Sequence, residues 1–315
     1  MIKLNLIEKL NHYGEQKEPF LFVIDYELQN YEIIPLNELP NNISYEIDTE
    51  NYNSQNISIR KEHITKENYK NKFEKIQENI LNGNTYLLNL TTPTKIETTA
   101  TLSEIYNKAN AKYKLYYKDK FICFSPERFV NIEDNKIFTY PMKGTIDANI
   151  KDAENVIMED KKELAEHTMV VDLLRNDLSI VAKNVKVEKF RYSEKIKAGD
   201  KELYQISSKI SAQLESDWSK RIGEIITSLL PAGSITGTPK KKTIEIIKNI
   251  ENYERGYFTG VFGIYDGDSL DSAVMIRYIE KEDDGSLIYK SGGGITCDSD
   301  MSSEYQEMCD KVYIP

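Results

Sequence analysis

The stretch Tyr257–Glu280, YFTGVFGIYDGDSLDSAVMIRYIE, decides the fold class. Two apolar segments, Tyr257–Tyr265 and Leu270–Glu280, flank Asp266-Gly267, a dipeptide typical of the turn between two antiparallel strands. The strands predicted elsewhere gather around helices, without the regular strand–helix alternation that builds a parallel sheet. We therefore expect an α+β fold whose β-sheets are mainly antiparallel.

Hydrophobic spacing predicts the other elements. The clearest helix is expected at 66–82, where Tyr69, Phe73, Ile76 and Ile80 recur every three or four residues. Further helices are predicted at 101–111, 150–176, 217–229, 240–254 and from Ser302, and strands at 20–26, 85–91, 113–117, 121–124, 128–132, 136–140, 185–191, 202–210 and 287–291. Residues 1–60 are weakly patterned, and the polar stretch ending near Asn56 is interpreted as peripheral loop and edge structure.

Composition narrows the class of protein. Of the 315 residues 40% are hydrophobic and the formal net charge is −10, so we expect a globular core and no broad attraction for nucleic acid or an anionic membrane. The first twenty residues hold no apolar run typical of a signal peptide, and no stretch is long and apolar enough for a membrane span. Three scattered cysteines suggest no disulfide framework. We expect a cytoplasmic protein.

Two glutamate pairs, Glu163/Glu166 and Glu304/Glu307, have the spacing that places both carboxylates on one face of a helix. A solvated surface face is the more frequent origin of such a pair. The first pair differs because His167 and the apolar run Met169–Leu174 adjoin it, which indicates a helix buried on several sides. Buried carboxylates need a counter-charge, and oxygen ligands without a histidine set favour Mg²⁺.

Lys143 lies in the segment Pro141-Met142-Lys143-Gly144-Thr145, which we expect to be a tight turn. A loop lysine is usually solvated, and at its reference pKa of ~10.4 only about one in 2,500 is neutral at pH 7. Partial burial against the apolar residues before it would lower that pKa and allow the amine to act as a nucleophile.

Arg277 and a run of three glycines are candidate anion-binding elements. Arg277 is expected inside an apolar strand with both faces buried, so its guanidinium needs either a structural carboxylate or a substrate carboxylate. Gly292, Gly293 and Gly294 follow a predicted strand, and they offer bare backbone N–H groups to a ligand or, equally, form a bulge or tight bend.

The order of these segments along the chain is more informative than any one of them. The segments are Ser125–Phe129, Pro141–Thr145, Glu166–Leu178, Pro231–Lys240, Ile276-Arg277, Gly292–Ile295 and Glu304–Glu307. Their order resembles that of the chorismate-utilising enzymes, which include anthranilate, aminodeoxychorismate, isochorismate and salicylate synthases. The resemblance runs from about Lys66 to Tyr313 and implies one two-layer α+β domain, with mainly antiparallel sheets flanked by helices and a Mg²⁺-dependent site.

The resemblance also implies roles for single residues. Glu166 and Glu307 resemble the primary Mg²⁺ ligands, with Glu163 and Glu304 beside them, and Glu127 resembles the general acid that assists loss of the C4 hydroxyl of chorismate. The residues that match substrate-binding positions are Gly144, Thr145, Arg277, Gly292, Gly293, Gly294 and Lys311. Residues 1–60 match poorly and are interpreted as a shortened N-terminal region packed on the catalytic domain, 61–315.

Two positions distinguish the members of the family. Anthranilate and isochorismate synthases usually carry a small residue at the position of Lys143, whereas the Pro-x-Lys-Gly-Thr form resembles aminodeoxychorismate synthase component I, in which the lysine forms a covalent adduct. Water-using members carry a lysine base at the position of Leu87, and leucine cannot deprotonate water, so ammonia is the expected nucleophile.

The resemblance leads to one main hypothesis and two alternatives. The chain is expected to aminate chorismate for 4-aminobenzoate and folate synthesis, with ammonia from a separate glutamine amidotransferase subunit, since no cysteine lies in a glutaminase nucleophile motif. The alternatives are anthranilate synthase component I and a non-catalytic relative that senses a small aromatic acid.

Overall fold

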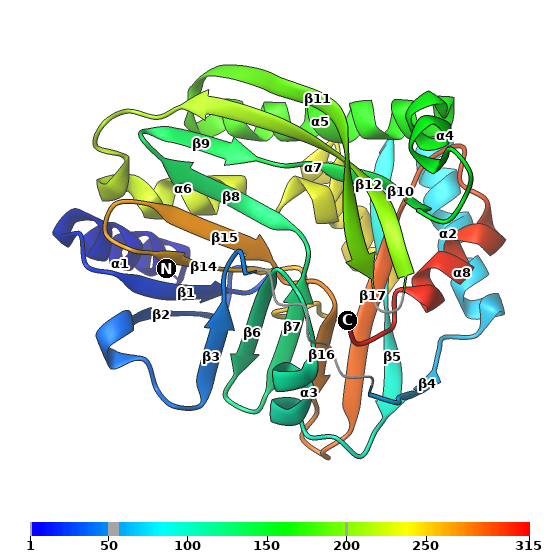
Figure 1. Ribbon diagram of the computed structural model, residues 1–315, viewed down its shortest axis with the longest axis horizontal. Helices are drawn as coiled ribbons and strands as arrows, with labels where there is room; N and C mark the ends of the chain where they lie inside the picture. The colour runs from blue at the N-terminus through cyan, green and yellow to red at the C-terminus, as the bar shows by residue number, and fades with distance from the viewer. Residues whose placement is uncertain (1, 50–56, 199–200) are drawn as a thin grey trace.

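The chain forms two antiparallel β-sheets with helices packed on them, as the computed structural model shows (Figure 1). The structure describes residues 2–49, 57–198 and 201–315. Every strand pairing within these ranges is antiparallel. The predicted α+β class with mainly antiparallel sheets is therefore confirmed.

The first sheet begins at the edge that carries Lys143. Its strands lie in the order β10 (Met142–Asp147), β12 (Lys201–Gln213), β9 (Lys136–Thr139), β8 (Arg128–Glu133), β15 (Leu270–Val274), β14 (Val261–Tyr265), β1 (Phe20–Ile24) and β2 (Tyr31–Pro35), and β11 (Lys183–Ala198) pairs with β12. Tyr265 pairs with Leu270 across the Asp266-Gly267 turn, so the predicted hairpin is confirmed.

The second sheet carries the three glycines. Its strands lie in the order β13 (Gly237–Thr238), β5 (Leu87–Glu97), β17 (Leu287–Ile295), β16 (Tyr278–Lys281), β7 (Phe121–Ser125), β6 (Tyr113–Tyr117) and β3 (Ile43–Glu46), and β4 (Arg60–Glu62) pairs with β5. Of the two alternatives for the glycines, the bulge or tight bend is wrong: they continue β17, with Gly292, Gly293 and Gly294 opposite Thr91, Leu90 and Asn89 without a register shift.

Helices cover both sheets. They are α1 (Ile2–Gln16), α2 (Lys66–Leu81), α3 (Leu102–Lys108), α4 (Ala153–Glu159), α5 (Lys161–Val181), α6 (Ile222–Leu229), α7 (Lys240–Glu251) and α8 (Met301–Asp310), with short 3₁₀ turns η1 (Leu36–Glu38), η2 (Trp218–Arg221) and η3 (Gly233–Ile235). Figure 1 shows α2 and α8 side by side at the outer end of β5 and β17. The predicted helix at 66–82 is confirmed as α2, capped by the Thr65 hydroxyl.

One helix was not predicted, and one helix prediction was wrong. The weakly patterned N-terminus contains α1, whose buried stripe is only Leu6, Leu10 and Gly14. A Cβ at Gly14 would lie 2.0 Å from the Ser219 carbonyl oxygen, so the glycine lets α1 pack closely on η2. The single helix predicted at 150–176 is instead α4 and α5, divided at Asp160, whose carboxylate caps α5 by accepting from the Glu163 N–H at 2.9 Å.

At two neighbouring places the chain crosses from one sheet to the other. One crossing, at Ser125–Arg128, joins β7 to β8, and the other, at Val274–Tyr278, joins β15 to β16. The Phe124 N–H donates to the Arg277 carbonyl at 3.0 Å, and the Val274 N–H donates to the Glu127 carbonyl at 3.2 Å. Arg277 therefore does not lie inside a strand as predicted; its φ of 52° belongs to the bend between sheets.

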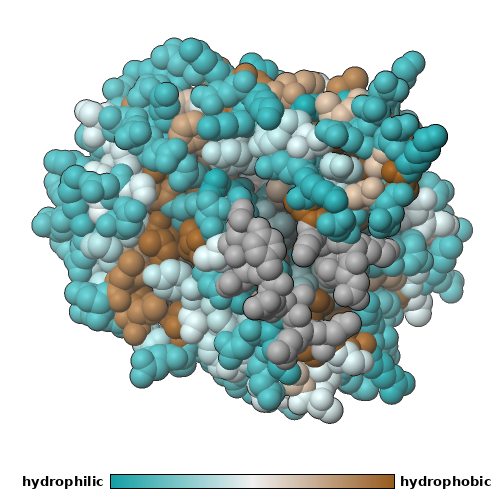
Figure 2. Space-filling view, viewed as in Figure 1, coloured by the Kyte–Doolittle hydropathy of each residue, from teal (hydrophilic) through white to brown (hydrophobic). Residues whose placement is uncertain are grey.

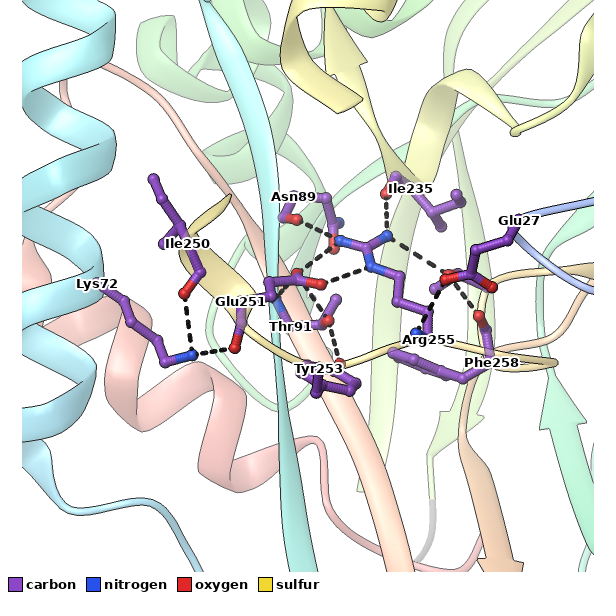
Figure 3. A network of polar contacts seen from close by, with 11 residues as sticks. Glu27, Lys72, Asn89, Thr91, Ile235, Ile250, Glu251, Tyr253, Arg255 and Phe258 are labelled. Carbon is purple, nitrogen blue, oxygen red and sulfur yellow. Dashed lines mark hydrogen bonds and ion pairs between the residues drawn. The ribbon is translucent and has the colours of Figure 1, made fainter. Parts of the chain in front are cut away.

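A buried ion pair lies where the two sheets meet (Figure 3). The guanidinium of Arg255, after α7, donates to both carboxylate oxygens of Glu251 at 2.8 and 2.7 Å. It also donates at 2.8 Å to the carbonyl of Asn89 on β5 and to that of Ile235 in η3. Glu251 in turn accepts from the Thr91 N–H at 2.7 Å. The pair thus takes the place of a neighbouring strand along the outer edge of β5.

The surface in the same view is mostly hydrophilic (Figure 2). A hydrophobic area lies at the left of that view, over the region where Figure 1 places β1, β2 and β3. Within the described ranges, no helix combines the length and apolar character needed to cross a membrane.

The Arg255–Glu251 pair yields a stability prediction. Arg255→Met leaves the Glu251 carboxylate buried without its ion partner, so we expect the free energy of unfolding to fall by about 3–5 kcal/mol. The double variant Arg255→Met/Glu251→Leu should lose less, because no charge is left unpaired. Urea unfolding at pH 7 measures both, with Lys183→Met, which breaks an exposed pair with Glu215, as a control expected to change stability by less than about 1 kcal/mol. A double variant no more stable than the single one would contradict this account.

Candidate active site

Lys143 lies on β10, not in the tight turn that the sequence predicted. The pairing of β10 with β12 shifts register between Met142 and Thr145, so Lys143 and Gly144 form a bulge. Gly144 has a φ of 97°, which favours glycine, and a Cβ there would lie 2.8 Å from Oε2 of Glu163. A bulge re-aims a side chain out of the strand's alternation, and here it directs Lys143 toward α5.

The ammonium of Lys143 forms an ion pair with the buried Glu166 of α5, with 2.8 Å between Nζ and Oε2. Burial alone would lower the pKa of Lys143, but the carboxylate of Glu166, with Glu307 and Glu163 further away, raises it above the ordinary value. The expectation that burial lowers this pKa is therefore wrong for this arrangement: the lysine is held as a cation.

The second glutamate pair lies on α8. Glu304 accepts a hydrogen bond from the Ser299 hydroxyl at 2.7 Å, and Glu307 forms an ion pair with Lys311 at 2.6 Å. Burial raises the pKa of Glu304. Burial would also raise the pKa of Glu307, but the Lys311 ammonium beside it lowers that pKa below its ordinary value. Lys311 itself has a pKa lowered by burial, and it also donates to the Gly292 carbonyl at 2.9 Å.

The glycines of β17 bring α8 close to the strand. A Cβ at Gly293 would lie 3.6 Å from Nζ of Lys311 and 3.7 Å from a carboxylate oxygen of both Glu304 and Glu307. Gly294 faces Leu87, whose Cδ1 would lie 3.2 Å from such a Cβ. One face of β17, at Gly293, therefore adjoins a cation and two carboxylates, whereas the opposite face, at Gly294, adjoins an apolar side chain.

The four glutamates lie within electrostatic reach of one another, because Glu307 and Glu163 act on the pKa of Lys143, and Glu166 acts on that of Glu304. They do not form a ready cage: in the part of the chain that the structure describes, no three acidic, histidine or cysteine side chains converge so as to hold a metal ion. Lys143 and Lys311 supply the counter-charges instead. The oxygen-only donor set still fits Mg²⁺ in its chemistry.

The carboxylate of Glu163 indicates that this place suits a cation or a hydrogen-bond donor. Its Oε2 is buried and has no hydrogen-bond partner. Burial raises the pKa of Glu163, and the Lys143 ammonium offsets only part of this effect. A buried carboxylate oxygen without a partner is costly, and a ligand that supplies a positive charge would remove that cost.

Arg277 and Glu127 lie at the two sheet crossings. Arg277 donates to the Lys311 carbonyl at 3.2 Å and stacks 5.1 Å from the centre of the Tyr313 ring, and its Nε is buried without a partner. Within the described residues no carboxylate is paired with Arg277, which favours the alternative that it binds an anionic ligand.

Glu127 lies beside a small cavity of about 20 Å³. Burial raises the pKa of Glu127, while the Ser234 hydroxyl and, at longer range, Lys311 lower it in part. A carboxyl group with a raised pKa is suited to donate a proton near neutral pH.

Thr145 is exposed on β10 next to Gly144, and within the described ranges its side chain makes no hydrogen bond to the acidic groups. All the other predicted site residues surround the region between β10, α5, β17 and α8 or lie at the adjoining crossings.

The sequence analysis missed two residues that the structure places at the site. Ser234, in η3, donates its hydroxyl to Oε1 of Glu127. The two ring nitrogens of His167 lie within hydrogen-bond distance of the Ser208 hydroxyl, at 2.7 Å, and of the Lys143 carbonyl, at 3.2 Å. His167 therefore stabilises the bulge at Lys143 and is not available to bind a ligand. Their position in the Pro231–Lys240 and Glu166–Leu178 segments was the signal that could have identified them.

The chain is similar to known proteins over most of its length. The family model described as chorismate binding enzyme matches residues 7–315. An uncharacterized PabA-like protein of Pasteurella multocida is 48% identical over 98% of both chains. Aminodeoxychorismate synthase component 1 of Escherichia coli is 32% identical over 79% of this chain, which spans only 57% of that protein.

Among solved structures, anthranilate synthase component I of Streptococcus pneumoniae is similar, with a TM-score of 0.69 and 25% identity. The match covers 84% of this chain and 60% of that one. The fold expected from the resemblance is thereby confirmed.

Alanine substitutions at the neighbouring glycines Gly292 and Gly293 should change the free energy of unfolding by different amounts. A Cβ at Gly292 would lie 2.3 Å from the Leu90 carbonyl oxygen, so Gly292→Ala must separate β17 from β5. We expect a loss of about 1–3 kcal/mol in the free energy of unfolding. Gly293→Ala meets its nearest atoms at 3.6–3.7 Å and should change stability by less than about 0.5 kcal/mol. Urea unfolding of both variants tests this, and equal losses would contradict it.

Glu163→Gln should stabilise the protein at neutral pH without added metal. The raised pKa of Glu163 means that its charged form is disfavoured by folding. The gain should be complete above the folded-state pKa and should vanish as the pH falls toward 4.5. Thermal unfolding from pH 4.5 to 8 measures it, with Glu159→Gln, an exposed carboxylate on α4, as the control. A destabilised Glu163→Gln at pH 7 would refute the interpretation.

Proposed function

The chain belongs to the chorismate binding enzymes, and from this premise we propose that it is component I of an aminodeoxychorismate synthase. It would convert chorismate and ammonia to 4-amino-4-deoxychorismate, on the route to 4-aminobenzoate and folate. The observation that carries the proposal is the position of Lys143. A bulge directs its amine toward the four glutamates Glu163, Glu166, Glu304 and Glu307, called here the acidic cluster, and Nζ lies 2.8 Å from Glu166.

The groups around the site suit a substrate with carboxylates. Arg277 offers a buried Nε without a partner, and Lys311 is a cation whose positive charge is disfavoured by burial. Both therefore gain from an anionic ligand. Gly293 has no side chain, so the backbone of β17 is bare where it faces Lys311.

In the proposed reaction Lys143 acts as nucleophile and Glu127 as general acid. The neutral amine of Lys143 forms a bond to C2 of chorismate, both ring double bonds shift toward C4, and the C4–O bond breaks, with the hydroxyl leaving as water after it takes a proton from Glu127. Ammonia then bonds to C4, both double bonds shift back, and the C2–N bond breaks to release the neutral amine of Lys143. The structure holds Lys143 as a cation, so it must leave Glu166 and lose a proton before it attacks.

Mg²⁺ is the cofactor proposed for the carboxylates of Glu166 and Glu307, with Glu163 and Glu304 beside them. When bound, it would neutralise a substrate carboxylate next to this acidic cluster. The unpartnered Oε2 of Glu163 and a proposed ligand set made of carboxylate oxygens support an oxygen-binding cation.

Leu87 supports ammonia rather than water as the second nucleophile. It is buried and would contact a Cβ at Gly294 at 3.2 Å, so an apolar group adjoins the predicted substrate strand. It cannot take a proton from water. We propose that a glutamine amidotransferase subunit supplies the ammonia, and that the enzyme works in the cytoplasm, where its three free thiols would stay reduced.

The proposal is tested by incubating the protein with chorismate, Mg²⁺ and ammonium and identifying the product by mass and fluorescence. We expect a non-fluorescent aminated product that yields 4-aminobenzoate when an aminodeoxychorismate lyase is added. Lys143→Ala should lower turnover at least about 100-fold. The control Lys162→Ala, a more exposed lysine 3.8 Å from Glu166, should lower it less than about threefold. Fluorescent anthranilate from both wild type and Lys143→Ala would overturn the proposal.

A further inference from the structure

The two carboxyl oxygens of Glu127 differ in their hydrogen bonding. Its Oε1 accepts the hydrogen bond from the Ser234 hydroxyl, whereas Oε2 has no hydrogen-bond partner among the described residues. The backbone of Glu127 is fixed as well, because its N–H donates to the Ser125 hydroxyl at 3.0 Å and its carbonyl accepts from Val274 at 3.2 Å. The remaining freedom of the residue is the orientation of its carboxyl group, and Ser234 controls that.

The loop that carries Ser234 is fastened on two sides. On the side of α5, Gly233 lies so close to Asp177 that a Cβ would be 2.7 Å from its Oδ2. Asp177 is itself held by the Lys240 ammonium at 2.8 Å. The loop therefore cannot move toward α5.

On the side of β5, the Arg255 guanidinium binds the carbonyl of Ile235, the residue after Ser234, at 2.8 Å (Figure 3). The same guanidinium binds the Asn89 carbonyl at 2.8 Å, and the Asn89 N–H donates to the Thr236 carbonyl at 2.8 Å. Asn89 lies opposite Gly294 in the glycine strand. One buried arginine thus sets the position of the Ser234 loop relative to the strand proposed to bind substrate.

We propose that Ser234 is a positioning residue for the general acid. The guanidinium of Arg255 fixes the loop that carries Ser234, and the Ser234 hydroxyl holds Oε1 of Glu127 so that Oε2 faces the substrate. Proton transfer requires the donor oxygen within hydrogen-bond distance of the leaving hydroxyl, and a carboxyl group that rotates freely meets that condition only part of the time. The inference rests on the acid role proposed above for Glu127.

A double-mutant cycle tests the inference with chorismate consumption as the readout. Ser234→Ala should lower kcat about 10- to 100-fold, the effect of losing one charge-assisted hydrogen bond, with KM for chorismate changed less than about threefold. In a Glu127→Gln background the same substitution should have no further effect, because Ser234 acts only through Glu127. Equal effects of Ser234→Ala in both backgrounds would overturn the inference.

Thr236→Val is the matched control. It removes a hydroxyl from the same loop, and the Thr236 hydroxyl donates to the carbonyls of Ala232 and Gly233, at 2.9 and 3.2 Å, and not to Glu127. We expect kcat within about threefold of the wild type. A loss as large as that of Ser234→Ala would mean that loop integrity, and not the hydrogen bond to Glu127, matters.

A second measurement does not depend on turnover. In protein labelled with ¹³C at the glutamate carboxyls, the signal absent from Glu127→Gln reports the titration of Glu127. Its charged surroundings are Lys311 on one side and Arg128 and Asp177 around the cavity. Because the Ser234 hydroxyl stabilises the ionised form, Ser234→Ala should move the midpoint to higher pH, and Thr236→Val should leave it unchanged.

The two measurements separate the possible failures. If the wild type does not consume chorismate, the proposed function fails and the titration alone decides whether Ser234 holds Glu127. If the wild type consumes chorismate but the Glu127 midpoint is the same in Ser234→Ala, the positioning role is refuted while the proposed function stands.

Discussion

The arrangement of the two sheets depends on the buried ion pair of Arg255 and Glu251. Where β13 ends, the outer edge of β5 would leave the Asn89 carbonyl and the Thr91 N–H without partners, and a buried backbone group without a partner is costly. The ion pair satisfies both groups, and Arg255 also binds η3, which belongs to the other side of the site. Its charges are tolerable inside the protein because both groups are hydrogen-bonded to each other, to fixed backbone groups and to the hydroxyls of Thr91 and Thr259.

The crossings between the two sheets explain why site residues come from distant parts of the sequence. A strand that leaves one sheet for the other must interrupt its ladder of hydrogen bonds, and here two strands do so together, at Ser125–Arg128 and Val274–Tyr278. The interruption exposes side chains that a regular strand would direct into the core. Glu127 and Arg277 occupy these two bends, whereas Lys143 gains its direction from a bulge, which is a smaller interruption of the same kind.

Sequence patterns predicted what depends on local spacing. The period of Tyr69, Phe73, Ile76 and Ile80 identified α2, and the Asp266-Gly267 turn identified the antiparallel pairing. The pattern failed for α1, where Gly14 has the sequence character of a helix breaker but serves as a contact point with η2. It also failed for Arg277, because an apolar run looks the same whether it stays in one sheet or crosses to another. Ser234 could not be assigned, since its importance lies in a hydrogen bond to a residue 107 positions away.

Electrostatics gives the acidic cluster a further property. The carboxylate of Glu166 already pairs with Lys143 through Oε2 and, at longer distance, with Lys162 through Oε1, so a divalent cation bound there would compete with Lys143 for its negative charge. The arrangement with Lys143 on Glu166 is neutral by itself and keeps the amine protonated, so it is a resting arrangement under the proposed function. Only when another positive charge satisfies Glu166 does the advantage of keeping the proton on Lys143 disappear. The same carboxylate that holds the amine inactive would then hold the cofactor that releases it.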